Sequence, residues 1–319
     1  MINSEEPYLT LYNFSFMINT FLRKAKRAVE PQFWLFKWQR SVTGLPLRKA
    51  SINIIKRMLG NRPVTGAKML DIRNIEEHVL SLKSKGFTNL GQLLSQSQVE
   101  AIKAALKNYK CFDPYNKAAG QFDPAQAPLL CHTAHYQRED LIKNDIIINI
   151  ANDSAILKIV QEVLGAVPTI SNINCWWSFA GRSKAEHAQL FHRDVDDFKF
   201  LKLFVYLTDV TSTDGPHIYV SGSHDINKAT QIRRYQDDEI KATFGEENIK
   251  SFEEPQGSLF LVDTFGIHKG MLPQKNDRLL LQVQYSLLPL YVESYQPVNL
   301  PMQSDLDHYV NRLLLKQEN

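Results

Sequence analysis

The chain has 319 residues, 44% of them hydrophobic and 22% charged, which is enough to bury one large core and fits a single domain with an N-terminal extension. No apolar run comes near the roughly 18 residues of a membrane span, and the first residues lack the layout of a secretory signal, so we expect neither. Cys111, Cys131 and Cys175 are widely separated and make neither a disulfide framework nor a zinc motif, which favours a cytoplasmic protein.

The net charge of +3 is unevenly distributed along the chain. Residues 20–62 contain eleven Lys or Arg and a single acidic residue, Glu30, and residues 33–38 mix aromatic side chains with a lysine. We favour a helical extension whose aromatic residues pack on the main domain while its cations face water. Peripheral contact of residues 20–62 with a membrane surface or another anionic partner is the alternative, and a nucleic-acid partner is not expected.

Helical patterns come first along the chain and strand patterns follow. We expect helices near residues 15–30, 47–60, 73–84, 96–109 and 152–164, the fourth opening with the capping-box spacing of Ser97 and Glu100. Strands should dominate from about 168 to 290. The charged and polar interval 225–250 predicts a long insertion or lid between two strands.

The most informative motif is His192-Arg193-Asp194. In an extended strand, residues i and i+2 point to the same face, so His192 and Asp194 can reach one ion while Arg193 turns away. A further histidine, His268, follows the apolar run 258–263, which reads as a strand opened by the turn residues 255–257. Two imidazoles and one carboxylate can hold a divalent iron and leave coordination positions open.

Two strand candidates alternate with a period of two. Residues 200–207 are aliphatic at odd positions and aromatic or basic at even ones, which indicates one face in a core and another lining a cavity. In residues 278–285, Arg278, Gln282 and Gln284 share the polar face. A buried guanidinium is expensive without an anionic partner, and a bound carboxylate would supply one.

Several other polar or aromatic residues have an ordinary structural interpretation that we prefer to a functional one. Residues 131–135 are expected to form a loop rather than a metal cluster, because no partners follow at zinc-site spacing. The remaining candidates, for the substrate rim, the pocket wall or plain hydrogen bonding, are His187, His217, His224, Trp176, Trp177, Asp196 and Asp197.

These motifs together resemble the phytanoyl-CoA dioxygenase family of iron(II)- and 2-oxoglutarate-dependent oxygenases. The resemblance covers roughly residues 80–290, and its motifs lie at residues 189–194, 203–209, 214–216, 221–224 and 268–278. In one departure, Ser221 stands where the family usually has proline before its Gly-Ser-His; this changes a turn and leaves the expected ligands untouched.

The resemblance implies an α+β fold with a mainly β core, a double-stranded β-helix of the jelly-roll or cupin-like type flanked by helices. Residues 1–75 would form a basic helical extension, residues 76–295 the oxygenase domain and residues 296–319 a helical tail. It also implies Fe(II), 2-oxoglutarate and dioxygen as cofactor and co-substrates. The implied site residues are His192, Asp194 and His268 as iron ligands, Arg278 on the far carboxylate of 2-oxoglutarate, and Asn174 and Phe204 near the co-substrate.

The expected reaction is hydroxylation of an unactivated C–H bond of a small molecule, because related halogenases replace the carboxylate found here at Asp194. The basic N-terminal region tilts the expected substrate slightly toward an anionic or lipid-like molecule. Two alternatives stay open. One is a cupin-like binding protein that keeps the metal without the catalysis, and the other is a module tethered to lipid or nucleic acid through its basic segment.

Overall fold

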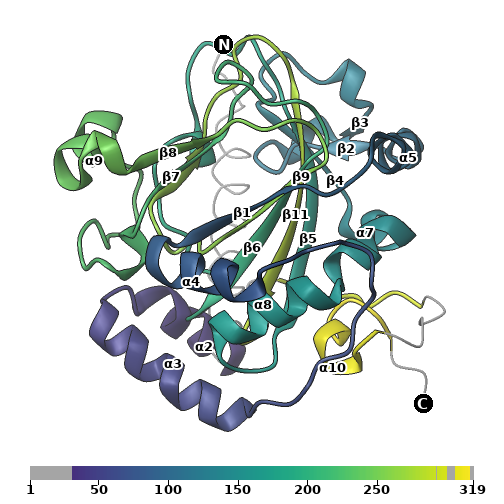
Figure 1. The fold of residues 1–319 in the computed structure, drawn as a ribbon. Helices are drawn as coiled ribbons and strands as arrows, with labels where there is room; N and C mark the ends of the chain where they lie inside the picture. Colours follow the sequence, from purple (N-terminus) through teal and green to yellow (C-terminus); the bar gives the residue numbers. More distant parts are fainter. Residues whose placement is uncertain (1–30, 292, 300–305, 317–319) are drawn as a thin grey trace, which may run out of the picture.

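The computed structural model describes residues 31–291, 293–299 and 306–316. Its centre is a pair of antiparallel sheets, one of eight strands in the order β1-β9-β6-β11-β5-β4-β2-β3 and one of three strands in the order β10-β7-β8 (Figure 1). The strands are β1 (Phe87–Gln92), β2 (Cys111–Phe112), β3 (Gln121–Phe122), β4 (Thr133–Tyr136), β5 (Thr169–Ser178), β6 (Phe200–Tyr206), β7 (His217–Val220), β8 (Ile249–Phe252), β9 (Ser258–Val262), β10 (His268–Gly270) and β11 (Arg278–Ser286).

Helices flank the large sheet, and α4 and α8 lie across one face of it (Figure 1). The helices are α2 (Pro31–Ser41), α3 (Leu45–Leu59), α4 (Ile75–Lys85), α5 (Gln96–Leu106), α6 (Arg138–Ile142), α7 (Asp145–Ala151), α8 (Ser154–Leu164), α9 (Asp237–Phe244) and α10 (His308–Asn311). Within the described residues, no helix has both the length and the apolar character needed to cross a bilayer.

The expected helices near 47–60, 73–84, 96–109 and 152–164 are present as α3, α4, α5 and α8, while the one at 15–30 lies outside the described residues. The predicted capping box, Ser97 with Glu100, is two residues later in the sequence than the observed one. Ser95 is the N-cap of α5 and pairs reciprocally with Gln98. The helix α2 lies within the expected helical extension, although its bounds were not predicted, whereas the strands β1 to β4, which precede residue 168, and the helices α6, α7 and α9 were not anticipated.

The alternation in β6 and β11 has the predicted consequence. β11 pairs with β5 on one side and β6 on the other, so it lies at the centre of the large sheet. Its aliphatic residues Leu279, Leu281 and Val283 join the main core with residues of α8. Their neighbours on the opposite face point away from this core, into the space between the two sheets. This mainly antiparallel double-sheet core confirms the expected fold class.

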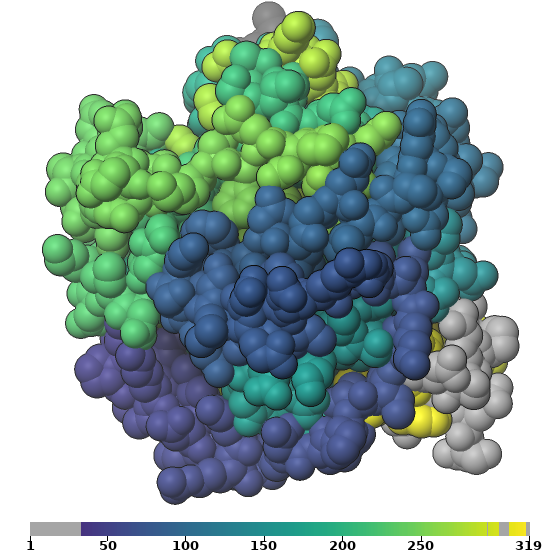
Figure 2. All heavy atoms as spheres, viewed as in Figure 1, coloured from purple at the N-terminus to yellow at the C-terminus, as the bar shows by residue number. Residues whose placement is uncertain are grey.

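Asp197 anchors both N-terminal helices, α2 through its buried carboxylate and α3 through its backbone carbonyl. Asp197 Oδ1 accepts hydrogen bonds from Phe198 N (2.7 Å) and from Gln39 Nε2 of α2 (3.0 Å), and Oδ2 accepts one from Leu288 N (2.9 Å). Arg48 of α3 is 2% exposed, donates to the Asp197 carbonyl, and stacks over Phe265 at 3.8 Å from the ring centroid. Figure 2 shows the purple segment from residue 31 onward lying along the lower edge of the molecule.

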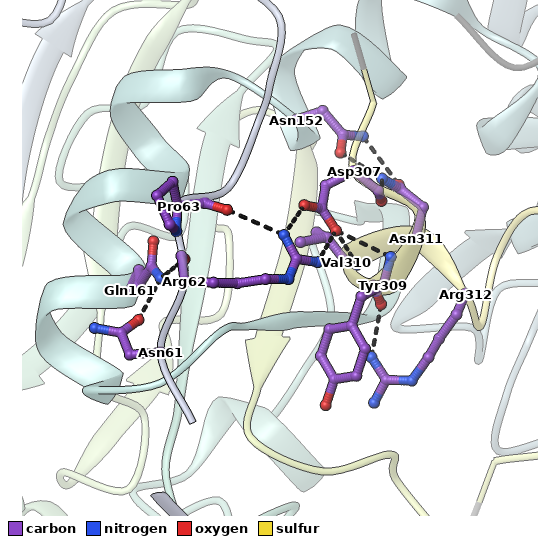
Figure 3. A network of polar contacts seen from close by, with 10 residues as sticks. All are labelled: Asn61, Arg62, Pro63, Asn152, Gln161, Asp307, Tyr309, Val310, Asn311 and Arg312. Carbon is purple, nitrogen blue, oxygen red and sulfur yellow. Dashed lines mark hydrogen bonds and ion pairs between the residues drawn. The ribbon is translucent and has the colours of Figure 1, made fainter. Parts of the chain in front are cut away.

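The C-terminal helix is held by a second polar network (Figure 3). Arg62 makes two hydrogen bonds with the Asp307 carboxylate, at 2.6 and 2.8 Å, and Asp307 also caps α10 through Tyr309 N. The buried amides of Asn152 and Asn311 bond each other in both directions, at 3.1 and 2.7 Å. These contacts join the segment before α4, the start of α8 and the chain's last described helix.

We predict that Asp197 makes stability depend on pH. Burial raises the pKa of Asp197 to about 6, against the opposing hydrogen bonds from Leu288 and Phe198, so the folded state holds this proton more tightly than the unfolded state. This contribution is fully present below the unfolded pKa of about 3.9 and is lost as pH rises through about 6. The unfolding free energy of the wild type relative to Asp197→Asn should therefore fall by up to about 3 kcal/mol between pH 4 and pH 7.

Chemical denaturation at several pH values measures this difference. The variant Asp238→Asn, which alters an exposed carboxylate, is the matched control. A stability difference between wild type and Asp197→Asn that stays constant over this range would contradict the prediction.

Candidate metal centre and cavity

Backbone pairing brings the separated histidines side by side. His192 and His268 form an antiparallel bridge in which each backbone N–H donates to the other's carbonyl, at 2.9 and 3.0 Å. Asp194 N continues the pairing by donating to Thr264 O at 2.9 Å. As a result the centroids of the two imidazole rings lie 4.3 Å apart. One ligand atom from each of His192, Asp194 and His268 lies within 4.8 Å of the others.

In both imidazoles the Nδ1 atom is engaged in a hydrogen bond, and the Nε2 atom faces the common centre. His192 Nδ1 lies 2.8 Å from Leu190 O and His268 Nδ1 lies 2.9 Å from Gly266 O, so each Nδ1–H donates to a carbonyl. The Nε2 atoms each lie 3.4 Å from an oxygen of Asp194. Burial and the neighbouring His268 lower the pKa of His192, which favours the neutral imidazole that metals bind. This set of donors fits a ferrous ion.

Lys202 is a residue of this centre that motif spacing did not single out. Its Nζ lies 2.7 Å from Asp194 Oδ2 and 3.2 Å from Asp196 Oδ2, and the side chain is buried. Although burial opposes ionisation, Lys202 and His268 hold the pKa of Asp194 well below its usual range. The ammonium occupies one carboxylate oxygen and leaves Asp194 Oδ1 for a metal. The available signal was the basic even position in the alternation of residues 200–207.

Arg193 turns away from the centre, as the strand pattern predicts, and forms hydrogen bonds with several backbone carbonyls. Its guanidinium donates to Phe265 O (2.5 Å), Ser223 O and Lys228 O (both 2.8 Å), Ala229 O (2.9 Å) and Ile226 O (3.3 Å). One side chain therefore ties the His192–Asp194 segment to residues 223–229 and to the segment that precedes His268.

A cavity of about 260 Å³ extends from this centre between the sheets. Arg278 lies on its wall, 4% exposed, with Nη2 donating to Ser178 Oγ at 3.1 Å and Nη1 donating to Gly215 O. Gly215 has φ 73°, and a Cβ there would lie 2.6 Å from Met271 O, so the turn that offers this carbonyl requires glycine. Arg278 Nε has no partner among the described residues, and burial lowers the pKa of the guanidinium.

The other candidates divide between the cavity and the scaffold. Asn174, Phe204, Trp176, His217 and Asp196 line the cavity. Trp177 instead packs on the core and bonds Tyr136, and Asp197 anchors α2. His217 was expected to make core or turn hydrogen bonds, yet its buried Nε2 has no hydrogen-bond partner in the described part of the chain.

Residues 131–135 were expected to form a loop, but from Thr133 onward they belong to strand β4, which pairs with β5. His132 Nδ1 lies 3.1 Å from Gln189 Oε1, and His135 stacks on Trp176 at the cavity wall, 5.4 Å between ring centroids. His187 stacks on Tyr115 at 3.7 Å, and His224 Nε2 lies 3.2 Å from Lys83 O. None of these groups competes with the centre formed by His192, Asp194 and His268.

Comparison with known proteins gives one decisive match. The family model described as phytanoyl-CoA dioxygenase (PhyH) matches residues 82–271, more than half of the chain. No curated protein matches. Three solved structures share a distant likeness. HygX from Streptomyces hygroscopicus, with nickel, 2-oxoglutarate and hygromycin B bound, is 18% identical over 70% of this chain and 90% of its own, with a TM-score of 0.47.

The carbocyclase SnoK from nogalamycin biosynthesis is 15% identical over 69% of this chain and 87% of its own, with a TM-score of 0.48. AviO1 from Streptomyces viridochromogenes Tue57 is 14% identical over 66% of this chain and 94% of its own, with a TM-score of 0.44. At this distance these structures carry no argument about activity, whereas the family match does. The chain belongs to the phytanoyl-CoA dioxygenase family and is an iron(II)- and 2-oxoglutarate-dependent oxygenase.

Proposed function

We propose that His192, Asp194 and His268 hold the iron of this oxygenase on one side. The observation that carries this proposal is that two Nε2 atoms and one carboxylate oxygen converge at the end of a cavity, each oriented by a hydrogen bond on its far side. Partners of this kind orient metal ligands and tune their basicity. Bound iron and 2-oxoglutarate supply the oxidation of substrate by dioxygen, with release of succinate and carbon dioxide.

Arg278 receives the far carboxylate of 2-oxoglutarate in this proposal. Among the charged residues that line the cavity, it is the one without a charged partner in the described chain, and its Nε is free. A guanidinium matches a carboxylate geometrically, and the bound anion would offset the cost of burying Arg278. Asn174 and Phe204 line the same cavity, and Phe204 packs against His217, 4.8 Å between ring centroids.

The surrounding residues position the ligands and exclude water. Lys202 fixes Asp194, and Arg193 fixes the backbone on both sides of the histidine pair. The rings of Phe204, Phe252 and Phe260 pack together beside His217 and form an apolar wall. Such a wall strengthens the electrostatic interactions inside the site. The substrate is a small molecule, and we propose that it is hydroxylated, because Asp194 supplies the carboxylate whose place a halide would need.

We also propose that the N-terminal extension supports the site instead of tethering the enzyme. The buried contacts of Gln39 and Arg48 with Asp197, three residues after Asp194, support this role. Trp38 packs on Phe198 at 4.6 Å between ring centroids, although 43% of Trp38 is exposed. Peripheral membrane contact through residues 20–62 and a cytoplasmic location stay predictions.

Removal of the carboxylate ligand should abolish turnover. Loss of a residue that only orients a ligand typically weakens metal affinity about 10- to 100-fold, so Asp194→Ala should weaken Fe(II) binding at least about 100-fold. Succinate release should disappear with it. Metal titration and succinate assays measure both effects, with Asp238→Ala as the control. Wild-type turnover in Asp194→Ala would refute the ligand assignment.

Removal of the guanidinium should act on the co-substrate alone. Arg278→Ala removes charge-assisted hydrogen bonds of about 1.5–3 kcal/mol each, so the KM for 2-oxoglutarate should rise about 100-fold while Fe(II) affinity changes little. Arg278→Lys, which keeps the charge without the planar fork, should lie between the two. Steady-state kinetics and calorimetric 2-oxoglutarate binding test this, and an unchanged KM in Arg278→Ala would remove Arg278 from the co-substrate site.

A further inference from the structure

Four amide side chains form a continuous patch on the cavity wall. In the register of β5 and β11, Asn174 lies opposite Gln282 and Asn172 lies opposite Gln284. All four line the cavity, and we refer to them as the amide wall.

None of the four amide-wall side chains has a hydrogen-bond partner within the part of the chain that the structure describes. Gln284 is 2% exposed and its Nε2 is fully buried without a partner, while Gln282 is 6% exposed. A buried polar group left unpaired is costly, and each amide offers two donors and an acceptor. The amide wall is therefore prepared for a ligand that supplies donors and acceptors together.

The far pair of the amide wall lies beyond the reach of 2-oxoglutarate as proposed above. Gln284 follows Arg278 by six residues on β11, about 20 Å along the strand. It pairs across the sheet with Lys202, whose long side chain brings Nζ to Asp194, so Asn172 and Gln284 lie on the Lys202 side of the metal centre, away from Arg278. A five-carbon dicarboxylate held between Arg278 and the metal leaves this pair for the molecule to be oxidised.

The charges at this end of the cavity are already paired. Lys202 contacts both Asp194 and Asp196, and Glu293 lies 3.2 Å from Arg138, so each charged side chain here already contacts one of opposite sign. A carboxylate or ammonium group of a ligand would find no free counter-charge here, and an acyl chain would leave the amides unsatisfied. Hydroxyl groups are uncharged and both donate and accept.

Resting on the proposed function, we infer that the molecule oxidised by this enzyme is polyhydroxylated, a saccharide or cyclitol whose hydroxyls bind Asn172 and Gln284. Trp176 and Tyr115 also line the cavity, each with one face already stacked on a histidine, and aromatic surface of this kind suits the C–H face of such a ring. An anionic substituent on this molecule has its place outside the amide wall. There, the exposed Arg40 and Arg234 border an adjoining hollow that reaches His192 and Asp194.

The experiment titrates the full-length protein, loaded with Mn(II) and 2-oxoglutarate, with three sets of probes in a calorimeter. The first set contains neutral saccharides and cyclitols and their monophosphates, the second palmitoyl-coenzyme A, and the third free amino acids. We expect binding by members of the first set alone. Binding by the acyl thioester or an amino acid, with none by the first set, would overturn the inference.

Variants then locate the binding on the amide wall. Asn172→Leu and Gln284→Leu should each weaken binding of the saccharide probe at least tenfold, about 1.4 kcal/mol, and leave 2-oxoglutarate affinity within threefold. Gln121→Leu makes the same chemical change on an exposed strand position and should have no effect. The isosteric Asn172→Asp covers the case in which leucine disturbs folding. Undiminished saccharide affinity in the amide-wall variants would exclude the amide wall as the binding surface.

A separate assay keeps this inference distinct from the proposed function. Slow succinate release by the wild type from Fe(II), 2-oxoglutarate and dioxygen without any probe tests the oxygenase site alone. Its absence would refute the site assignment, whereas its presence together with failed saccharide binding would refute only the substrate class.

Discussion

The site depends on one short piece of backbone pairing, the bridge between His192 and His268. Two hydrogen bonds at that bridge place the imidazoles on one face, and the next pair, Asp194 with Thr264, carries the carboxylate to the same face. Only the His268 side of this bridge belongs to a regular strand, β10, so other contacts help to hold it. Arg193 supplies such contacts, because it follows His192 directly and its guanidinium donates to Phe265 O, which precedes His268, and to the carbonyls of Ser223 and Lys228. The residue between His192 and Asp194 thus helps to fix the geometry of both side chains.

The buried charged residues determine which end of the cavity suits which ligand. Lys202 forms ion pairs with Asp194 and Asp196 beside the metal centre, whereas Arg278 at the other end has only neutral partners. A cation buried in this way favours an anion at its own end and provides no attraction at the other. The same cavity can therefore select a dicarboxylate at one end and an uncharged polar surface at the other, without competition between the two ligands.

The sequence predicted those features whose cause is local. The i, i+2 spacing of His192 and Asp194 and the alternation around Arg278 follow from strand geometry, and both patterns agree with the structure. The two-residue strands β2 and β3 are too short to produce a period, so they were missed. The hydrogen bonds of Arg193 to carbonyls of residues 223–229 and the contact of Arg48 with Asp197 join segments distant in sequence, and residue patterns alone contain no signal for such contacts. Lys202 is only eight residues from Asp194, and the basic even position in residues 200–207 was a signal that it faces the cavity.

In the structure, the basic residues of the N-terminal region have different surroundings. Arg48 is buried in contacts with Asp197 and Phe265, so its charge is not available to a ligand. Arg40 remains exposed and borders the hollow next to His192, together with Arg234. Cations at the opening of a cavity attract a charged ligand and its outer groups over long range. The groups that enter the cavity are recognised by short-range hydrogen bonds. We therefore propose that the anionic substrate expected from charge and the polyhydroxylated one inferred from the amide wall are two parts of one molecule.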